Sequence, residues 1–307
     1  MITFESMTGD RFLLYGANGY TGRLIAQYAS EYGLQPILAG RNASALKAMS
    51  ETFHFPYRVF DLSETAKLDE ALKEARVVLN AAGPFADTAD LMIKACIRTG
   101  THYLDINGDI QVFESIRKFD EVARSSNIML LPGVGFDVVP TDCMALYLKK
   151  KMPAATHLKL AFATIGGGLS HGTAMTVINK LGEGGAERIN GSIEKKPLGE
   201  KGMWIDFGPS KHFVMSIPWG DVSTAGFTTD IPNITSFTAV PRGVFTTLKF
   251  QGMFNWILRT KMIRDIARGR IKKKPAGPDE ASRKKAKSLI WGEVENATGE
   301  KMAHRIV

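Results

Sequence analysis

Three glycines near the N-terminus have the spacing of a turn that holds a dinucleotide. Gly16, Gly19 and Gly22 follow the apolar run 12–15, typical of a buried strand, and lead into residues 23–32, which have helical periodicity. In such a unit the first glycine permits a tight turn, the second lets backbone N–H groups approach a pyrophosphate, and the third lets the helix pack closely. The N-terminus of the helix favours negative charge. The pattern therefore predicts a dinucleotide site, with a turn that binds no ligand as the alternative.

Arg41 is a second candidate contact, at the end of the apolar strand predicted over 35–41. In dinucleotide-binding folds this strand ends beside the adenosine ribose. An acidic side chain there accepts from the 2′-hydroxyl of NAD, whereas an arginine accommodates the 2′-phosphate of NADP. No Asp or Glu stands beside Arg41. The sequence therefore favours NADP over NAD, and a solvated loop arginine is the alternative.

Strand-like and helix-like segments alternate along the first 150 residues. Further strands are expected at 57–60, 77–84, 102–105 and 128–131, and helices at 42–53, 63–74 (with Ser63 as N-cap), 87–98 and 109–125. This order is typical of a parallel, doubly wound sheet with a ligand crevice at the carboxyl ends of its strands. The predicted cofactor-binding residues lie at those ends: Gly16, Asn18, Gly19, Tyr20, Thr21, Gly22, Arg41, Asp61, Ala81, Ala82 and Gly83.

The pattern changes beyond residue 152. Short strands broken by Gly and Pro fill 192–240, and residues 289–295 and 301–307 form a predicted closing hairpin. The expected fold class is α/β: a Rossmann-type doubly wound parallel sheet with a second, smaller α+β domain. Residues 1–152 are the predicted NADP-binding domain. Residues 153–307 are the predicted substrate and dimerisation domain, with an antiparallel sheet and helices on one of its faces.

The positive charge is concentrated in one segment. The chain of 307 residues has a net charge of +8, yet residues 259–287 alone hold 12 Lys and Arg against three acidic residues. A solvated face with a mobile loop is one interpretation. Contact with anionic lipid is another, because Met253, Trp256 and Ile257 give this region an apolar side. Nucleic acid is not expected as a partner, since no binding motif accompanies the charge.

Several features bear on the compartment. Cys96 and Cys143 lie in helix-like apolar segments and are predicted to be buried, reduced thiols of an intracellular protein. The N-terminal residues, with Glu5 and Asp10, lack the apolar core of a signal peptide, and no apolar run is long enough to span a membrane. The expected location is cytoplasmic, with peripheral membrane contact as an alternative. The six histidines are scattered, so no metal site is expected.

Five motifs together resemble a known family. They are Tyr-Gly-Ala-Asn-Gly-Tyr-Thr-Gly at 15–22, Leu-Ala-Gly-Arg at 38–41, Asn-Ala-Ala-Gly-Pro-Phe at 80–85, His-Tyr-Leu-Asp at 102–105 and Pro-Gly-Val-Gly-Phe-Asp-Val-Val-Pro-Thr-Asp at 132–142. The chain resembles the saccharopine dehydrogenase-like oxidoreductases, which include trans-acting enoyl reductases. This resemblance implies an NADP-binding Rossmann domain, a smaller α/β domain and a homodimer. Longer relatives continue past the hairpin, so a truncated form of a longer member is an open alternative.

The residues that would supply a proton are less clear. Asp105 ends a predicted strand on the ligand side, Asp137 lies in the 132–142 motif, and His171 stands at a predicted helix start. Each is a weak catalytic candidate with a structural alternative: a capping carboxylate, a turn carboxylate and a structural histidine. Tyr147 and Lys151 match a Tyr-x-x-x-Lys pair but lie in a lysine-rich helix end, where a solvated surface is the preferred interpretation.

The hypothesis is an NAD(P)H-dependent oxidoreductase of the saccharopine dehydrogenase-like type. It would reduce a C=C or C=N bond in a lipid-derived or small metabolite, because hydride transfer belongs to the nicotinamide and the protein supplies position and a proton. A non-catalytic dinucleotide-binding adaptor at a lipid surface is one alternative. A saccharopine reductase of lysine metabolism is another, since a family likeness does not fix a substrate.

Overall fold

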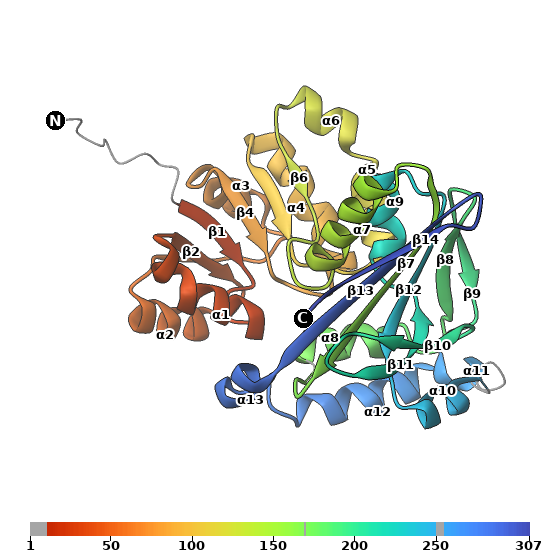
Figure 1. Ribbon diagram of the computed structural model, residues 1–307. Helices are drawn as coiled ribbons and strands as arrows, with labels where there is room; N and C mark the ends of the chain where they lie inside the picture. The colour runs from red at the N-terminus through yellow and green to blue at the C-terminus, as the bar shows by residue number, and fades with distance from the viewer. Residues whose placement is uncertain (1–10, 169, 250–254) are drawn as a thin grey trace. The chain divides into compact units, whose positions relative to one another are not determined.

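The computed structural model describes residues 11–168, 170–249 and 255–307, which divide into two compact units (Figure 1). The first unit holds described residues 11–107 and 111–135, and the second holds 108–110 with the chain from Phe136 onward. The predicted boundary at Met152 is therefore too late. Met144 and Leu148 share a core with Leu158 of the second unit, so the helix that carries them belongs there. The second unit is consequently not the smaller of the two.

The sheet of the first unit is wholly parallel, in the order β3-β2-β1-β4-β5-β6. This is the order of a dinucleotide-binding sheet, in which successive strands are added to one side of β1 up to β3 and to its other side from β4 onward. The strands are β1 (Arg11–Tyr15), β2 (Gln35–Gly40), β3 (Tyr57–Val59), β4 (Val77–Asn80), β5 (His102–Asp105) and β6 (Leu130–Leu131). The predicted Rossmann-type sheet is confirmed.

Both faces of this sheet are buried. Leu13 and Ile37 pack into one core, whereas their neighbours Leu14 and Leu38 pack into another, because successive strand residues point to opposite faces. The helices are α1 (Tyr20–Ala29), the 3₁₀ turn η2 (Ser30–Tyr32), α2 (Ala43–Phe53), α3 (Thr65–Lys73), α4 (Phe85–Thr99), α5 (Ile110–Arg117) and α6 (Asp120–Ser125). The nearly continuous apolar strands of this unit follow from burial on both sides.

Two local predictions in this unit are wrong. The single helix expected over 109–125 is two helices, because the chain tightens at Lys118 and Phe119, whose N–H groups donate to carbonyls three residues back. Ser63 is not an N-cap, since α3 begins later. Its N–H and hydroxyl groups donate instead to Asp61 Oδ1, at 3.0 and 2.8 Å.

The second unit is built on a mixed sheet, with the order β10-β11-β12-β7-β13-β14 and with β8 and β9 attached through β12. Its elements are α7 (Val139–Lys151), β7 (Ala155–Ile165), α8 (His171–Asn179), β8 (Gly185–Ile189), β9 (Ser192–Lys196), β10 (Gly202–Asp206), β11 (Lys211–Ile217), α9 (Asp221–Thr229), β12 (Asn233–Ala239), α10 (Arg242–Lys249), α11 (Asn255–Leu258), α12 (Lys261–Lys272), α13 (Glu280–Lys285), β13 (Lys287–Asn296) and β14 (Lys301–Ile306). The expected antiparallel sheet needs one correction, because β12 and β7 pair in parallel. The closing hairpin of β13 and β14 is confirmed.

Two other expectations can be compared with the structure. Cys96 is buried as predicted, but Cys143 is exposed, because its side chain lies away from the α7 face that packs on the sheet. None of the described helices is both long and apolar enough to cross a membrane. Met253, Glu5 and Asp10 lie outside the described residues.

Candidate functional site

The turn after β1 is held so tightly that only glycine fits at its start. Gly16 has φ +81°, and a Cβ there would lie 2.7 Å from Ala82 N, at the end of β4. A Cβ on Gly22 would lie 2.4 Å from Gly16 O, so α1 approaches the turn without a side chain between them. Gly19 N–H donates to Gly16 O at 3.0 Å and closes the turn. The predicted roles of the first and third glycines match this geometry.

The N-terminus of α1 points out of this turn. Gly19 is its N-cap, with no side-chain capping bond, and the first helical residues are Tyr20 and Thr21. The first N–H groups of a helix have no acceptor within the helix and carry a partial positive charge. Asn18 is exposed, and its Oδ1 would lie 3.2 Å from a Cβ on Gly40, at the end of β2. This arrangement leaves a shallow cradle of backbone donors that fits a diphosphate.

Arg41 and Asp61 meet beyond the ends of β2 and β3. Arg41 Nη1 lies 3.6 Å from Asp61 Oδ2, and the side chains are 77% and 44% exposed. Hydrogen bonds from Ser63 lower the pKa of Asp61, and Arg41 adds to the effect. Because both groups are accessible, the guanidinium is free to turn from Asp61 toward a more highly charged anion.

The turn after β4 completes the same edge of the sheet. Ala81 N–H donates to Tyr15 O at 2.8 Å, Ala82 N–H donates to Asn80 Oδ1 at 3.1 Å, and Thr88 Oγ1 donates to Ala82 O at 2.8 Å. Ala81, Ala82 and Gly83 place only small side chains at this strand end, and none of the three is fully buried. The structure thus brings together the predicted cofactor residues, which come from β1, α1, β2, β3 and β4.

Asp105, a weak catalytic candidate, is enclosed within the first unit. Its Oδ1 accepts from the N–H and Nδ2 of Asn107 at 3.0 and 2.7 Å and from Gly133 N–H at 2.8 Å, while Oδ2 accepts from the Tyr103 hydroxyl at 2.7 Å. Burial raises the pKa of Asp105, and these hydrogen bonds oppose the rise. Its role is structural, because it joins the end of β5 to the loop at Gly133 and has no exposed surface.

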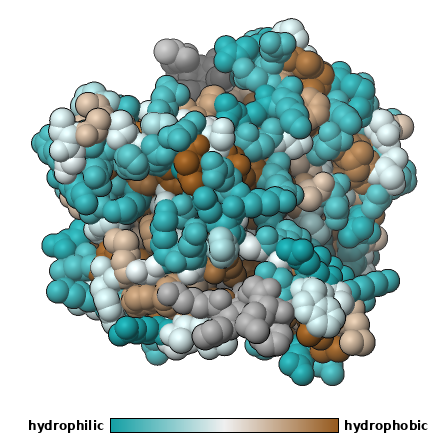
Figure 2. Space-filling view, turned by 90° about the vertical axis from the view of Figure 1, so that its right-hand side faces the viewer, coloured by the Kyte–Doolittle hydropathy of each residue, from teal (hydrophilic) through white to brown (hydrophobic). Residues whose placement is uncertain are grey.

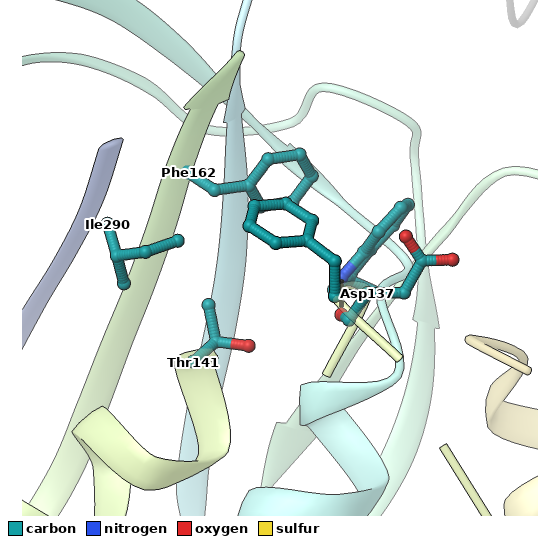
Figure 3. Close-up of a pocket in the computed structure, with 6 residues that line it drawn as sticks. Asp137, Thr141, Phe162 and Ile290 are labelled. Atoms are coloured by element: carbon teal, nitrogen blue, oxygen red, sulfur yellow. Dashed lines mark hydrogen bonds between the residues drawn. The ribbon is translucent and has the colours of Figure 1, made fainter. Parts of the chain in front are cut away.

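The second unit contains a separate apolar recess, too tightly filled by its own side chains to hold a water molecule, lined by Phe136, Asp137, Thr141, Phe162, Trp219 and Ile290 (Figure 3). Phe162 and Ile290 are register partners on β7 and β13, so they line it from neighbouring strands. The rings of Phe162 and Trp219 lie 4.8 Å apart between centroids. Trp219 Nε1 donates to the Asp137 carbonyl, which anchors the indole. In this view the Asp137 carboxyl group points away from Thr141 and Ile290.

A buried acid stands behind Thr141. Thr141 Oγ1 lies 2.6 Å from Asp221 Oδ1 and 2.9 Å from Val138 O. The Thr141 hydroxyl has one hydrogen, which it can donate to either oxygen, and a protonated Asp221 can in turn donate to Thr141 Oγ1. Burial raises the pKa of the fully buried Asp221 well above its ordinary value, the hydrogen bond from Thr141 opposes this rise, and the charges of nearby Asp142 and Asp137 add to it. Asp221 therefore holds a proton in conditions where most carboxyl groups have lost theirs.

Asp221 is the polar residue that sequence reasoning missed. Asp137, Thr141 and Asp142 all fall within the 132–142 motif, but Asp221 lies in Pro-Trp-Gly-Asp at 218–221, far along the chain. Nothing in that segment marks a functional acid. The structure pairs it with Thr141 because α9 packs against α7.

Asp137 and His171, the remaining catalytic candidates, belong to the second unit. Burial raises the pKa of Asp137, and its side chain packs against Gly108, where an added Cβ would lie 3.2 Å from Asp137 Cβ. His171 Nε2 lies 2.8 Å from Lys274 O, so that nitrogen carries a hydrogen and donates it. His171 N–H donates to Ala276 O at 2.8 Å. His171 thus anchors the loop after α12 to the start of α8, which supports its structural interpretation.

The Tyr147 and Lys151 pair does not have a catalytic geometry. Lys151 Nζ lies 5.8 Å from the centroid of the Tyr147 ring, over its face, and the ring lies 4.9 Å from that of His304. The preferred interpretation as a surface pair agrees with this arrangement.

Comparison with known proteins now identifies the first unit. The family described as the saccharopine dehydrogenase NADP binding domain matches residues 12–131. The matched segment covers all six strands of the parallel sheet except the first residue of β1. The predicted resemblance is confirmed, and NADP is confirmed as the cofactor of this domain family.

Full-length relatives are similar over part of their length. A saccharopine dehydrogenase-like oxidoreductase from Rattus norvegicus is 30% identical over 214 residues, which are 61% of this chain and 50% of the relative. A trans-acting enoyl reductase from Mycobacterium ulcerans is 29% identical over 147 residues, which are 45% of this chain and 35% of the relative. The chain spans about half the length of the first of these relatives, and its match is to an oxidoreductase family.

One solved structure extends the likeness beyond the first unit. Apo saccharopine dehydrogenase (L-Glu forming) from Saccharomyces cerevisiae matches with a TM-score of 0.62 and 12% identity, covering 97% of this chain and 86% of that chain. At this identity the match shows the fold alone. It confirms the predicted combination of a Rossmann-type domain and a second domain.

Proposed function

We propose that this chain is an NADP-dependent reductase of the saccharopine dehydrogenase-like type. The glycine-lined turn between β1 and α1 carries this proposal, because a Cβ at Gly16 or Gly22 would collide with backbone and the turn exposes a helix N-terminus. The backbone donors near Gly19 and Thr21 would hold the diphosphate. The turn at 81–83 would leave room for the rest of the cofactor across the end of β4.

Arg41 supports NADP over NAD. Its guanidinium is 77% exposed at the end of β2 and its described ion-pair partner is the exposed Asp61. The 2′-phosphate of NADP is a better partner than a single carboxylate, because it offers several acceptor oxygens and a higher charge. Asp61 would hold Arg41 near this position before the cofactor arrives.

The bound nicotinamide would supply hydride, and the protein would then have to supply a proton. Asp221 is the described carboxyl group that best meets this need, because it is fully buried and contacts the hydroxyl of Thr141, which lines the recess. Asp137 is the second candidate, since burial raises the pKa of its carboxyl too. We assign the proton-holding role to Asp221 through Thr141.

We infer which kind of bond is reduced from the name of one relative. The mycobacterial relative is called a trans-acting enoyl reductase, so a conjugated C=C bond is our first choice and a C=N bond our second. Phe136, Phe162 and Trp219 beside Thr141 form an apolar surface, which favours an apolar acceptor. The substrate itself would be lipid-derived or a small metabolite.

Fluorescence titration with NADPH and NADH tests the proposal. NADPH is expected to bind at micromolar concentration and more tightly than NADH, and its oxidation should then be followed with enoyl thioesters and with imines. Absence of binding by either nucleotide would overturn the proposal. Binding without turnover of any acceptor would favour the dinucleotide-binding adaptor instead.

A further inference from the structure

Helices α11 and α12 expose large apolar side chains, and the same segment holds cations without a described ion-pair partner. Trp256 is 72% exposed, Met262 68% and Ile266 50%. Met262 and Ile266 are four residues apart on α12 and therefore lie on one side of that helix. In Figure 2 apolar residues appear among hydrophilic ones at the lower edge, at the height at which α10, α11 and α12 lie in Figure 1. We call Trp256, Met262, Ile266 and the cations described next the outer face of α12.

The inner side of the same helices is fixed by arginine. Arg259 Nε donates to Gly182 O at 2.9 Å, and Arg264 Nη2 donates to Leu181 O at 3.0 Å. These bonds join α11 and α12 to the chain just after α8. The arrangement of α12 is therefore set by its inner contacts, and Met262 and Ile266 are left outside them.

Arg268, a third arginine on the inner side, forms an ion pair with Asp265 on the same helix. Arg268 contacts Asn179 Oδ1 through Nε and Nη2, at 3.2 and 2.7 Å, and its Nη1 donates to Asp265 Oδ1 at 2.9 Å. Asp265 is thus neutralised within its own helix. The negative charge nearest to Met262 and Ile266 along the chain is already paired.

The cations of the outer face have no such partners. Lys261, Arg270, Lys273 and Lys274 are exposed, and none forms an ion pair with a residue that the structure describes. This surface thus combines four positive charges that have no described ion-pair partner with three exposed apolar side chains. Cations attract an anionic lipid surface, whereas the apolar side chains gain free energy only by leaving water.

We propose that the outer face of α12 docks on an anionic phospholipid surface, with Met262, Ile266 and Trp256 inserted at the headgroup level and the four cations paired with lipid phosphates and carboxylates. The 12-residue helix would lie along the surface, because about 20 residues are needed to cross the hydrocarbon core. A nucleic acid would satisfy the cations but would leave the aliphatic side chains without a role. The charge and the apolar side chains together therefore favour lipid.

Vesicle sedimentation tests this proposal with the full chain. Phosphatidylcholine vesicles that contain phosphatidylserine are expected to sediment the protein, and pure phosphatidylcholine vesicles are not. Because each cation near an anionic surface contributes about a fivefold gain in affinity, R270Q/K273Q should weaken binding about 30-fold. The neutral change M262S/I266S should weaken it at least about 10-fold, since two apolar side chains lose their burial.

Two matched variants separate this surface from general effects. K149Q/K150Q removes two cations from the end of α7, and V122S/M129S removes two apolar side chains that are each 45% exposed in the first unit. Both should bind vesicles like the unchanged protein. NADPH binding should be intact in all four variants, which shows that they are folded and keeps this inference distinct from the proposed reductase activity.

Several results would overturn the proposal. These are failure to sediment with either vesicle, equal sedimentation with and without phosphatidylserine, or equal losses in the matched variants. An effect of R270Q/K273Q without any effect of M262S/I266S would identify a general polyanion surface, and a nucleic acid would then be the better candidate.

Discussion

Arg41 is the residue on which cofactor preference depends. Replacing it by alanine removes a charge-assisted contact to the 2′-phosphate, whose loss costs about 1.5–3 kcal/mol. Arg41→Ala should therefore weaken NADPH binding about 10- to 100-fold and leave NADH binding unchanged. Fluorescence titration with both nucleotides measures the two affinities.

Arg11 provides the matched control for this change. It is an exposed arginine at the opposite end of β1 from the glycine turn, so Arg11→Ala should leave both affinities as they were. Equal loss of NADPH and NADH affinity in Arg41→Ala would contradict the 2′-phosphate assignment, because NADH lacks that group.

The raised pKa of Asp221 predicts how the stability of the protein changes with pH. Its pKa is raised by burial in the folded protein, so the unfolded chain loses this proton first as the pH rises above about 4. The folded state then binds the extra proton, and the free energy of unfolding falls by up to about 1.4 kcal/mol per pH unit until the folded pKa is passed. Asp221→Asn has no such proton, so its stability relative to the unchanged protein should rise over this range. Urea unfolding at a series of pH values measures the difference.

Asp61→Asn is a control of opposite sign. Hydrogen bonds from Ser63 lower the pKa of Asp61, so this carboxylate stabilises the fold above its unfolded pKa, and that contribution disappears as the pH falls through the folded pKa. The stability of Asp61→Asn relative to the unchanged protein should fall slightly as the pH rises, because Asp61 is exposed. A pH-independent difference for Asp221→Asn would refute the protonated assignment.

At the scale of the element, the glycines of the β1–α1 turn are needed for close packing as well as for the candidate binding site. Gly16→Ala would combine a left-handed φ of +81° with a Cβ 2.7 Å from Ala82 N. The conformational cost is about 1 kcal/mol and the overpacking cost about 1–3 kcal/mol, so a loss of about 2–4 kcal/mol is expected. NADPH affinity should fall with it.

Gly33→Ala separates these two costs. Gly33 has φ +67° with no atom within 4 Å of an added Cβ, so only the conformational cost of about 1 kcal/mol applies. Urea unfolding of both variants gives the comparison. Equal losses would show that crowding against the β4 turn does not shape the site.

At the scale of the whole molecule, we propose a homodimer. β14 is an edge strand of the second unit's sheet, and Ile306 and Val307 beside that edge are 47% and 69% exposed. Exposed sheet edges are natural pairing surfaces. Light scattering during gel filtration should give twice the mass of the chain, and the mass of one chain at micromolar concentration would contradict the proposal.

The sequence by itself predicted the first unit almost completely. Short buried strands such as 12–15 and 102–105 alternate with amphipathic helices, and this local pattern specifies a parallel sheet because each βα repeat can close in only one hand. The gathering of the predicted cofactor residues at one edge was predictable for the same reason: Gly16, Arg41 and Ala81 all follow strands, and parallel strands end at one edge. Recurring local motifs therefore predicted both the fold of this unit and the position of its candidate site.

Only the tertiary structure decided the second unit and the chemistry within it. Two contacts join segments that are about 80 residues apart in the sequence: the parallel pairing of β7 with β12 and the contact of Thr141 with Asp221. The assignment of α7 to this unit also depends on contacts between distant segments. Burial, which raises the pKa of Asp221 and leaves Met262 exposed, likewise depends on what packs nearby. Local periodicity indicates which side of a helix or strand is apolar, but it does not indicate which other helix or strand covers that side.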